Sequence, residues 1–379
     1  TFRELETGRD KHSDNHALWV DPDNAGHLLA GTDGGFYESF DEGVRWRHFS
    51  NLPVSQFYKV ALSNTLPFYH VLGGAQDLGT LHGPSRTSFR DGIRNQDWYV
   101  PMGADGYGVA IDPEDGNILY LMTQEGNLSR TDRRSDESLG IQPQPAPNDP
   151  PERWNWDSPL LISPHDRHRI YYGSQRIWRS DDRGSSWTAI SGDLTQGSSR
   201  YQRPFMGRVW SVDDLHDNGA MSKYATTTAI SESPLAEGAL IVGTDDGVVQ
   251  FTADGGRTWT AAAPLPALPP RSFINDVEAS LVDPGTFYVA ADAHKIGDFS
   301  PYLFVTTDRG RTWTFMSNWN PRPMYASQPT IDPQDDRRVY MLNSYSFSDN
   351  GGESFTSPNT TTHGDDRFVW INPRDSRHV

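Results

Sequence analysis

The 379-residue sequence contains no cysteine, which excludes disulfide bonds, thiol catalysis and cysteine-type zinc sites. It has no apolar run approaching the roughly 18 residues that a transmembrane helix needs, so no membrane span is predicted. Basic residues are also scarce, because 33 Lys and Arg against 50 Asp and Glu leave a net charge of −17. Without a basic stripe, a nucleic acid partner is not expected.

What the sequence does contain is a repeated phrase, S/T-x-D-x-G-x-x-W. It begins at Ser39, Ser180, Thr252 and Thr306, and a fifth copy that begins at Ser348 has Asn and Phe in place of Asp and Trp. The phrase predicts a tight turn in which the short carboxylate binds backbone N–H groups and the glycine takes a positive φ. We therefore assign a structural rather than a catalytic role to the turn carboxylates Asp41, Asp182, Asp254 and Asp308.

Each turn is preceded by three short strand patterns, the first two of which are separated by an x-Pro turn, as at Asp21-Pro22. Four short antiparallel strands every 40 to 50 residues or so are typical of a β-propeller blade. The predicted fold class is therefore all-β, a seven-bladed β-propeller of four-stranded antiparallel blades, with residues 1–379 in a single domain. The seven units lie near residues 16–50, 57–100, 105–133, 154–190, 226–262, 273–316 and 325–357.

Two segments interrupt the repeat, and both chain ends carry partial units. Residues 139–153 are rich in proline and predict an extended surface loop, whereas residues 191–224 predict an insertion that caps one face. Thr1 to Leu5 reads as a fourth strand, and Phe368 to Pro373 reads as the first strand of a further blade. We expect either a portion of a longer repeat protein with further domains, or a ring closed by strands from both ends.

The strand order sorts polar residues onto one face. The loops that lead into the first strands, and those that join the second strands to the third, fall at the same end of the blades. We expect their side chains to form a ligand-binding rim, because such loops vary freely on a rigid scaffold. The predicted ligand-binding residues are Asp14, His16, Gln76, Asp77, Asp105, Asn155, Trp156, Asp157, Asp245, Asp276 and Glu278.

A pair of rim carboxylates also has the chemistry of a glycosidic acid and base, provided that burial separates their pKa values. The catalytic candidates under this alternative are Asp77, Asp157 and Asp105. Each of them could instead have a purely structural role, as a carboxylate that caps its own loop. Trp156, Trp210 and Tyr107 are candidate stacking platforms for a sugar, although a propeller tryptophan more often packs between blades. His12, Asp14 and His16 lie in a loop rather than on a metal-binding helix, so neither a metal nor a cofactor is predicted.

The repeated turn is similar to the Asp-box, or BNR repeat. Longer phrases, notably Asp14 to Pro22, Gly31 to Gly35 and Gly74 to Asp77, resemble bacterial repeat proteins related to sortilin-like and xyloglucanase-like propellers, which are often labelled glycosyl hydrolases. The sequence lacks the Arg-Ile-Pro of sialidases and the cysteines of sortilin-type receptors, and it supplies only one of the two propellers that xyloglucanases combine. The resemblance implies a secreted or periplasmic propeller that binds a carbohydrate or protein partner, with a glycoside hydrolase as the alternative.

Overall fold

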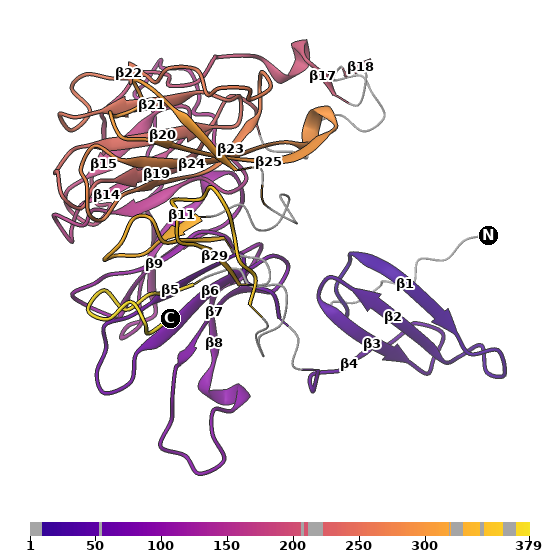
Figure 1. Ribbon diagram of the computed structural model, residues 1–379. Coiled ribbons are helices and arrows are strands. Elements are labelled where there is room, and N and C mark those ends of the chain that lie inside the picture. The colour runs from indigo at the N-terminus through magenta and orange to yellow at the C-terminus, as the bar shows by residue number, and fades with distance from the viewer. Residues whose placement is uncertain are drawn as a thin grey trace.

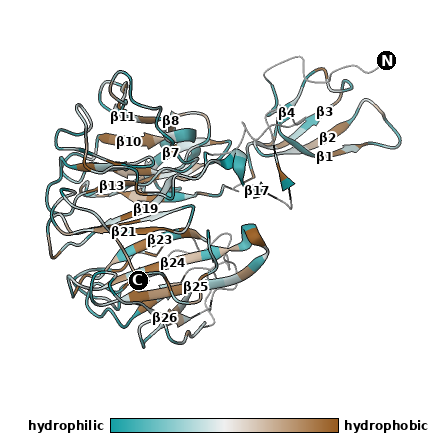
Figure 2. Ribbon diagram, turned by 90° about the horizontal axis from the view of Figure 1, so that it is seen from above, coloured by the Kyte–Doolittle hydropathy of each residue, from teal (hydrophilic) through white to brown (hydrophobic). Residues whose placement is uncertain are grey.

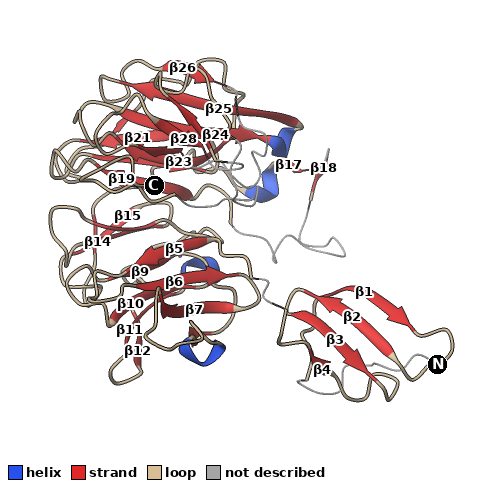
Figure 3. Ribbon diagram, turned by 60° about the horizontal axis from the view of Figure 1, so that its bottom comes forward, coloured by secondary structure: helices blue, strands red, loops and turns tan. Residues whose placement is uncertain are grey.

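A computed structural model describes residues 10–52, 55–205, 208–210, 223–317, 319, 329–341, 345–358 and 369–379. These residues form strands and turns with little helix (Figure 3). The short 3-10 helices are η1 (Asn95–Asp97), η2 (Gln124–Gly126), η3 (Arg200–Gln202) and η5 (His294–Ile296). Within the described ranges, no helix has the length and apolarity required to cross a membrane. The predicted strand at Thr1 to Leu5 lies outside these ranges.

Seven antiparallel sheets of three or four strands follow one another along the described chain (Figure 1). The first three sheets are β1 (Asn15–Val20), β2 (Leu28–Thr32), β3 (Gly35–Ser39), β4 (Arg47–His48); β5 (Lys59–Leu62), β6 (His70–Ala75), β7 (Gly79–Pro84), β8 (Tyr99–Met102); and β9 (Val109–Ile111), β10 (Ile118–Met122), β11 (Leu128–Asp132), β12 (Glu137–Gly140). The next two are β13 (Leu160–Ile162), β14 (Ile170–Gly173), β15 (Ile177–Ser180), β16 (Thr188–Ala189); and β19 (Thr227–Glu232), β20 (Leu240–Thr244), β21 (Val249–Thr252), β22 (Thr260–Ala261). The last two are β23 (Phe273–Ala279), β24 (Phe287–Ala293), β25 (Asp298–Thr306), β26 (Thr314–Ser317); and β27 (Pro329–Ile331), β28 (Val339–Met341), β29 (Ser346–Ser348).

The strands of each sheet pair in the order in which they occur in the sequence, so every sheet is a simple meander. Six sheets have four strands and the seventh has three among the described residues. The prediction of an all-β chain built from seven antiparallel units is confirmed, and the arrangement is consistent with a propeller. The third unit is longer than predicted, because its fourth strand, β12, reaches Gly140 and takes up the start of the segment expected to be a surface loop.

The repeated turns between third and fourth strands share one hydrogen-bond pattern. In the fifth sheet, Asp254 Oδ1 accepts the backbone N–H of Thr258 at 2.9 Å, and the Thr252 hydroxyl accepts the N–H of Gly256 at 3.1 Å. Gly256 has a φ of +90°, a conformation that glycine adopts without steric cost. These local bonds hold the carboxylate in the turn and leave it directed at its own backbone.

Two of the tryptophans that end these turns join their sheet to the previous sheet. Trp187 Nε1 donates to the carbonyl of Ile141 at 2.7 Å, and Trp259 Nε1 donates to that of Ile190 at 2.8 Å. Apolar clusters fill the space between successive sheets from β5–β8 onward, and Phe287 and Phe304 are fully buried in the cluster between the fifth and sixth sheets. Figure 2 shows the hydrophobic strands stacked together and the hydrophilic loops at their ends. The core is therefore a series of layers between neighbouring sheets.

The first sheet, β1–β4, lies apart from the other six (Figures 1 and 3). All six residues of β1 are exposed, and no residue of this sheet belongs to an inter-sheet apolar cluster of the described chain. Its contact with the second sheet includes His12 Nε2, which lies 3.9 Å from Asp77 Oδ1. The closed seven-bladed ring predicted from the repeats is therefore not what the structure shows.

The C-terminal segment, and not the first sheet, packs against the seventh sheet. Val369 and Ile371 contact Tyr340 of β28, the middle strand of that sheet. The backbone N–H of Asn372 bonds the carbonyl of His378 at 2.9 Å, the counterpart of the bond from Asp332 to Arg338 at 3.0 Å in the seventh sheet. Residues 369–379 thus form the turn expected after the first strand of a further unit.

The two inserted segments are more tightly anchored than sequence patterns predict. In residues 139–153, Glu152 is 5% exposed and pairs with Arg176 at 2.7 Å, so the end of this segment is packed rather than free. In residues 191–224, the described part includes the hairpin β17 (Pro204–Phe205) and β18 (Arg208–Val209). The backbone N–H of Gln196 donates to Asp246 at 2.8 Å, which fixes the start of this insertion to the fifth sheet.

Candidate functional site

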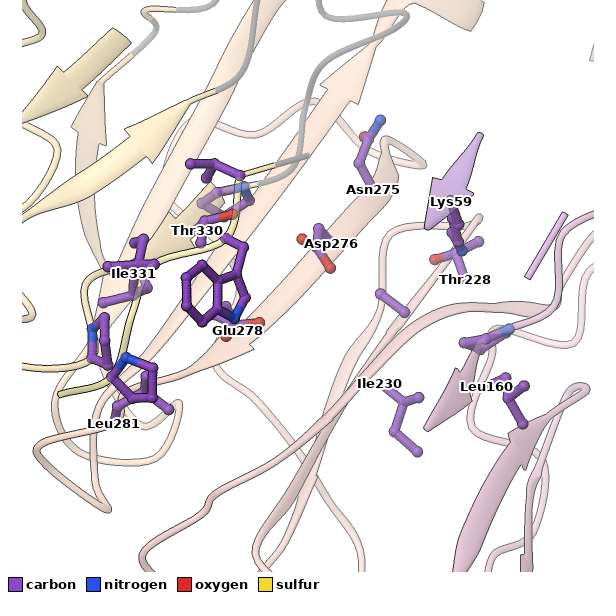
Figure 4. A pocket seen from close by; sticks show the side chains of 18 residues that line it. Lys59, Leu160, Thr228, Ile230, Asn275, Asp276, Glu278, Leu281, Thr330 and Ile331 are labelled. Carbon is purple, nitrogen blue, oxygen red and sulfur yellow. The ribbon is translucent and has the colours of Figure 1, made fainter. Parts of the chain in front are cut away.

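The first strands of the second, fourth, fifth, sixth and seventh sheets surround one cavity of about 480 Å³ (Figure 4). The C-terminal segment at Trp370 completes its wall. Ligand pockets commonly have volumes of about 300 to 1,000 Å³. We call this space the axial cavity, because it lies where the first strands of the successive sheets converge.

Strand β23 contributes the most polar part of the wall. Its register shifts between Ile274 and Asp276, so Asn275 is an extra residue, and such bulges redirect the side chains around them. Val277 is buried on the opposite face of the strand, in the core. Alternation along the strand therefore brings Asp276 and Glu278 to the cavity face, where Figure 4 shows both among the lining side chains.

Both side chains are half-buried, and neither carboxyl group has an ion-pair partner in the described chain. Burial raises the pKa of Asp276 to about 7, against a smaller opposing effect of Lys59. Burial, aided by the charge of Asp276, raises the pKa of Glu278 to about 8. Both groups therefore bind and release protons near neutral pH, which is unusual for carboxylic acids.

A lysine and an aspartate form an ion pair at the edge of the cavity. Lys59 Nζ lies 2.9 Å from Asp157 Oδ2, which joins β5 to the loop before β13. The neighbouring residues are aromatic: Tyr58 is 40% exposed, and Trp156 donates its indole N–H to the hydroxyl of Tyr107. Tyr107 itself is only 3% exposed, so its ring packs inside the protein and is not the stacking platform that the sequence suggested.

A second group of predicted site residues lies between the first and second sheets. The carboxylate of Asp105 accepts the backbone N–H of Asp77 at 3.0 Å, so the structure brings these two catalytic candidates together. Burial, with the charges of Asp105 and Asp33, raises the pKa of Asp77. One ligand atom each from His12, Asp14 and Asp77 lies within 4.8 Å of the others, a spacing that suits a divalent cation.

The other predicted rim residues are engaged within the protein. Asn155 donates to the hydroxyl of Thr226 at 2.8 Å, and Asp245 accepts both the N–H and the hydroxyl of Thr226. Burial raises the pKa of Asp245 to about 7 against these hydrogen bonds. His16 pairs with Asp33 in the first sheet, and Gln76 accepts the Tyr58 hydroxyl at 2.7 Å. The single rim expected from the sequence is thus divided into separate groups.

Sequence analysis missed three residues of the cavity region. Lys59 is the single charged residue in an otherwise apolar strand, and a charge at such a position could have indicated a functional residue. Tyr58 precedes it and was treated as part of the strand pattern. Trp370 aligns with Thr330 when the x-Pro turns at Pro373 and Pro333 are superposed, so the repeat itself places it on the cavity wall.

No known protein family matches this chain. It is 25% identical over 222 residues to a protein of Neosartorya fischeri named "probable oligoxyloglucan-reducing end-specific xyloglucanase", a match that covers 56% of this chain and 24% of that protein. It is 23% identical over 193 residues to a xyloglucanase of Paenibacillus sp, covering 46% of this chain and 18% of that protein. The chain therefore matches a quarter or less of the length of each relative.

Two solved structures cover most of this chain. One is an ancestral GH74 enzyme, with a TM-score of 0.45 and 13% identity over 88% of this chain and 36% of that chain. The other is U3-55K, with a TM-score of 0.45 and 11% identity over 89% of this chain and 90% of that chain. With TM-scores below 0.5, neither likeness bears on the function of this chain.

Proposed function

We propose that this protein binds a carbohydrate, with the axial cavity and its aromatic edge as the binding site. The observation that carries the proposal is the wall of the cavity. Carboxyl groups, an amide and an ammonium group converge there beside apolar side chains, a combination that suits a small-molecule site. The weak sequence similarity to two xyloglucanases supports a saccharide as the ligand class.

The side chains fit the demands of a sugar ring. Trp370 on the wall and Tyr58 near Lys59 are 46% and 40% exposed, and such rings stack against the apolar face of a pyranose. Asn275 Oδ1 is buried without a hydrogen-bond partner, so it is an acceptor available to a ligand hydroxyl. Binding a saccharide would satisfy this buried atom, which no group of the described protein satisfies.

A glycoside hydrolase is the second candidate, and the two cavity carboxyls favour it. Residues two apart on a strand are separated by roughly 6.6 Å, a spacing of the order that paired glycosidic carboxyls require. Glu278, with the higher pKa, would be the general acid, and Asp276 would act as the ionised partner. This assignment replaces Asp77 and Asp157 as the first pair to test, while Asp77 with Asp105 remains a separate candidate pair.

The type of repeat and the cellular location are also part of the proposal. We assign the repeated turns to the Asp-box type and the chain to a secreted or periplasmic propeller of the sortilin-like or xyloglucanase-like kind. Cell fractionation of the native host, with the chain detected by antibody, tests the location. Recovery from the cytoplasm alone would contradict it.

The experiment that tests the function measures binding and reducing-sugar release in the same samples. The purified chain is offered a glycan array and soluble polysaccharides, alongside Asp276→Asn, Tyr58→Ala and, as a separate-group comparison, Asp77→Asn. Binding without release that weakens in Tyr58→Ala supports the binding proposal. Sugar release that disappears in Asp276→Asn supports the hydrolase. Release that disappears only in Asp77→Asn moves the active site to the second group. If the chain shows neither binding nor release, both proposals are overturned.

A further inference from the structure

Neither the carboxyl group of Asp276 nor that of Glu278 has an ion-pair partner among the described residues, although both line the axial cavity. Asp276 accepts the backbone N–H of Val277 at 3.0 Å, and among the described residues Glu278 makes no hydrogen bond. The ammonium group of Lys59 is held by Asp157 at 2.9 Å rather than by either of them. Two carboxyls thus line one cavity, and the ammonium group of Lys59 on the same wall is paired with a different acid.

Such an arrangement is costly for the free protein. A carboxylate removed from water needs a counter-charge or several hydrogen bonds, and without them it takes up a proton instead. The pKa values of about 7 and about 8 reflect this cost. A positively charged ligand would offset this cost, because both carboxyl groups could then ionise beside a cation.

Comparison with the neighbouring sheet shows that the fold does not demand these acids. Strand β19 has the same register shift, between Thr227 and Ala229. Asp276 occupies the register position after the shift that Ala229 occupies in β19. An alanine is therefore compatible with the backbone at this position, and the carboxyl is an addition to the repeat.

The remaining wall indicates an organic cation rather than a bare metal ion. The cavity volume of about 480 Å³ is that of a small-molecule site. The wall also has an apolar part, with Leu281, Ile331 and Ile371, and the indole of Trp370 offers a stacking surface. A ring with an apolar face and one amino group satisfies both parts of this wall.

We infer that the axial cavity binds a saccharide bearing a free amino group, with its ammonium between Asp276 and Glu278. This inference rests on the proposed carbohydrate-binding function and narrows its ligand to amino sugars. The net charge of −17 adds to it, because it attracts cationic oligosaccharides to the protein. Asn275 Oδ1, which is buried without a partner, adds an uncharged acceptor for the same ligand.

Calorimetric titration at pH 6 tests the inference with three oligosaccharides of equal length: a glucosamine oligomer, its N-acetylated form and a cello-oligosaccharide. We expect the glucosamine oligomer to bind at least tenfold more tightly than the other two. Glu278→Gln and Asp276→Ala should each weaken that binding at least tenfold. Asp335→Asn removes one exposed acid that does not line the cavity, from the turn after β27, and is the matched control for net charge, with an expected change below twofold.

The outcomes separate this inference from the proposed function. Equal binding of the neutral and amino oligosaccharides overturns the amino-sugar inference and leaves carbohydrate binding intact, whereas no binding of any saccharide overturns both. Glucosamine binding that Asp335→Asn weakens as much as Glu278→Gln would be general charge attraction and would also overturn the inference. Thermal unfolding of each variant at pH 6 verifies that lost binding is not lost folding.

Discussion

Replacing Glu278 with glutamine should make the protein more stable at alkaline pH and leave it unchanged at acid pH. The half-buried Glu278 carboxyl has no ion-pair partner in the described chain, and burial raises its pKa from 4.5 to about 8 on folding. The folded chain therefore holds a proton that the unfolded chain releases over this interval. Stability is full below pH 4.5 or so and is lost as the pH rises toward 8. Glutamine has nearly the same shape and carries no charge at any pH.

The size of the effect follows from this interval. It spans about 3.5 pH units, and each costs about 1.4 kcal/mol, so full desolvation corresponds to roughly 5 kcal/mol at pH 8.5. The carboxyl faces a cavity that water enters, and solvent screening reduces the cost. We expect Glu278→Gln to gain about 2 to 3 kcal/mol at pH 8.5 and to match the wild type at pH 4.5.

Urea unfolding of the wild type and of Glu278→Gln at several pH values between 4.5 and 9 measures this difference. Asp335→Asn serves as the control, because Asp335 is exposed and its hydrogen bonds with Arg337 lower its pKa, so its removal should give no gain on the alkaline side. A difference between Glu278→Gln and wild type that is the same at every pH would refute the reasoning. So would a loss of stability at pH 8.5.

Three further substitutions test the packing between sheets by thermal or urea unfolding. Trp259→Phe removes an inter-sheet hydrogen bond and should cost about 1 kcal/mol more than Trp313→Phe, whose Nε1 has no partner; equal losses would contradict the joining role of the indole N–H. Phe287→Ala empties a fully buried site between the fifth and sixth sheets and should cost about 3 to 5 kcal/mol, so a loss below 1 kcal/mol would contradict the layered core. Arg183→Ala leaves the carboxylate of Asp112 buried without its 2.6 Å partner and should cost about 3 kcal/mol, whereas the additional change Asp112→Asn should recover part of this loss.

The repeat in the sequence was sufficient to predict the sheets. The Asp turns depend on hydrogen bonds between residues no more than four positions apart, such as Asp254 and Thr258. Local hydrogen bonds of this kind can be predicted from residue spacing alone. The turn at Asn372 was legible for the same reason. The position of the first sheet could not be predicted. Both β1 and the C-terminal segment resemble the first strand of a unit, and the sequence does not tell which of them packs against the seventh sheet.

The candidate site was only partly predictable. Asp276 and Glu278 were named from the strand order, as residues of a loop that leads into a first strand, whereas the structure places both within β23. The pairing of Lys59 with Asp157 joins residues 98 positions apart and depends on how the second and fourth sheets approach each other. For the same reason, the separation of Asp77 and Asp105 from the cavity carboxyls could not be derived from rim order.

The most direct test of the central claim is a crystal structure of the chain with a bound oligosaccharide, prepared with the ligand that binds best in titration. The account predicts a sugar ring in the axial cavity, against Trp370 and within hydrogen-bonding distance of Asn275 and Glu278. A sugar bound instead beside Asp77 and Asp105, with the axial cavity empty, would contradict it.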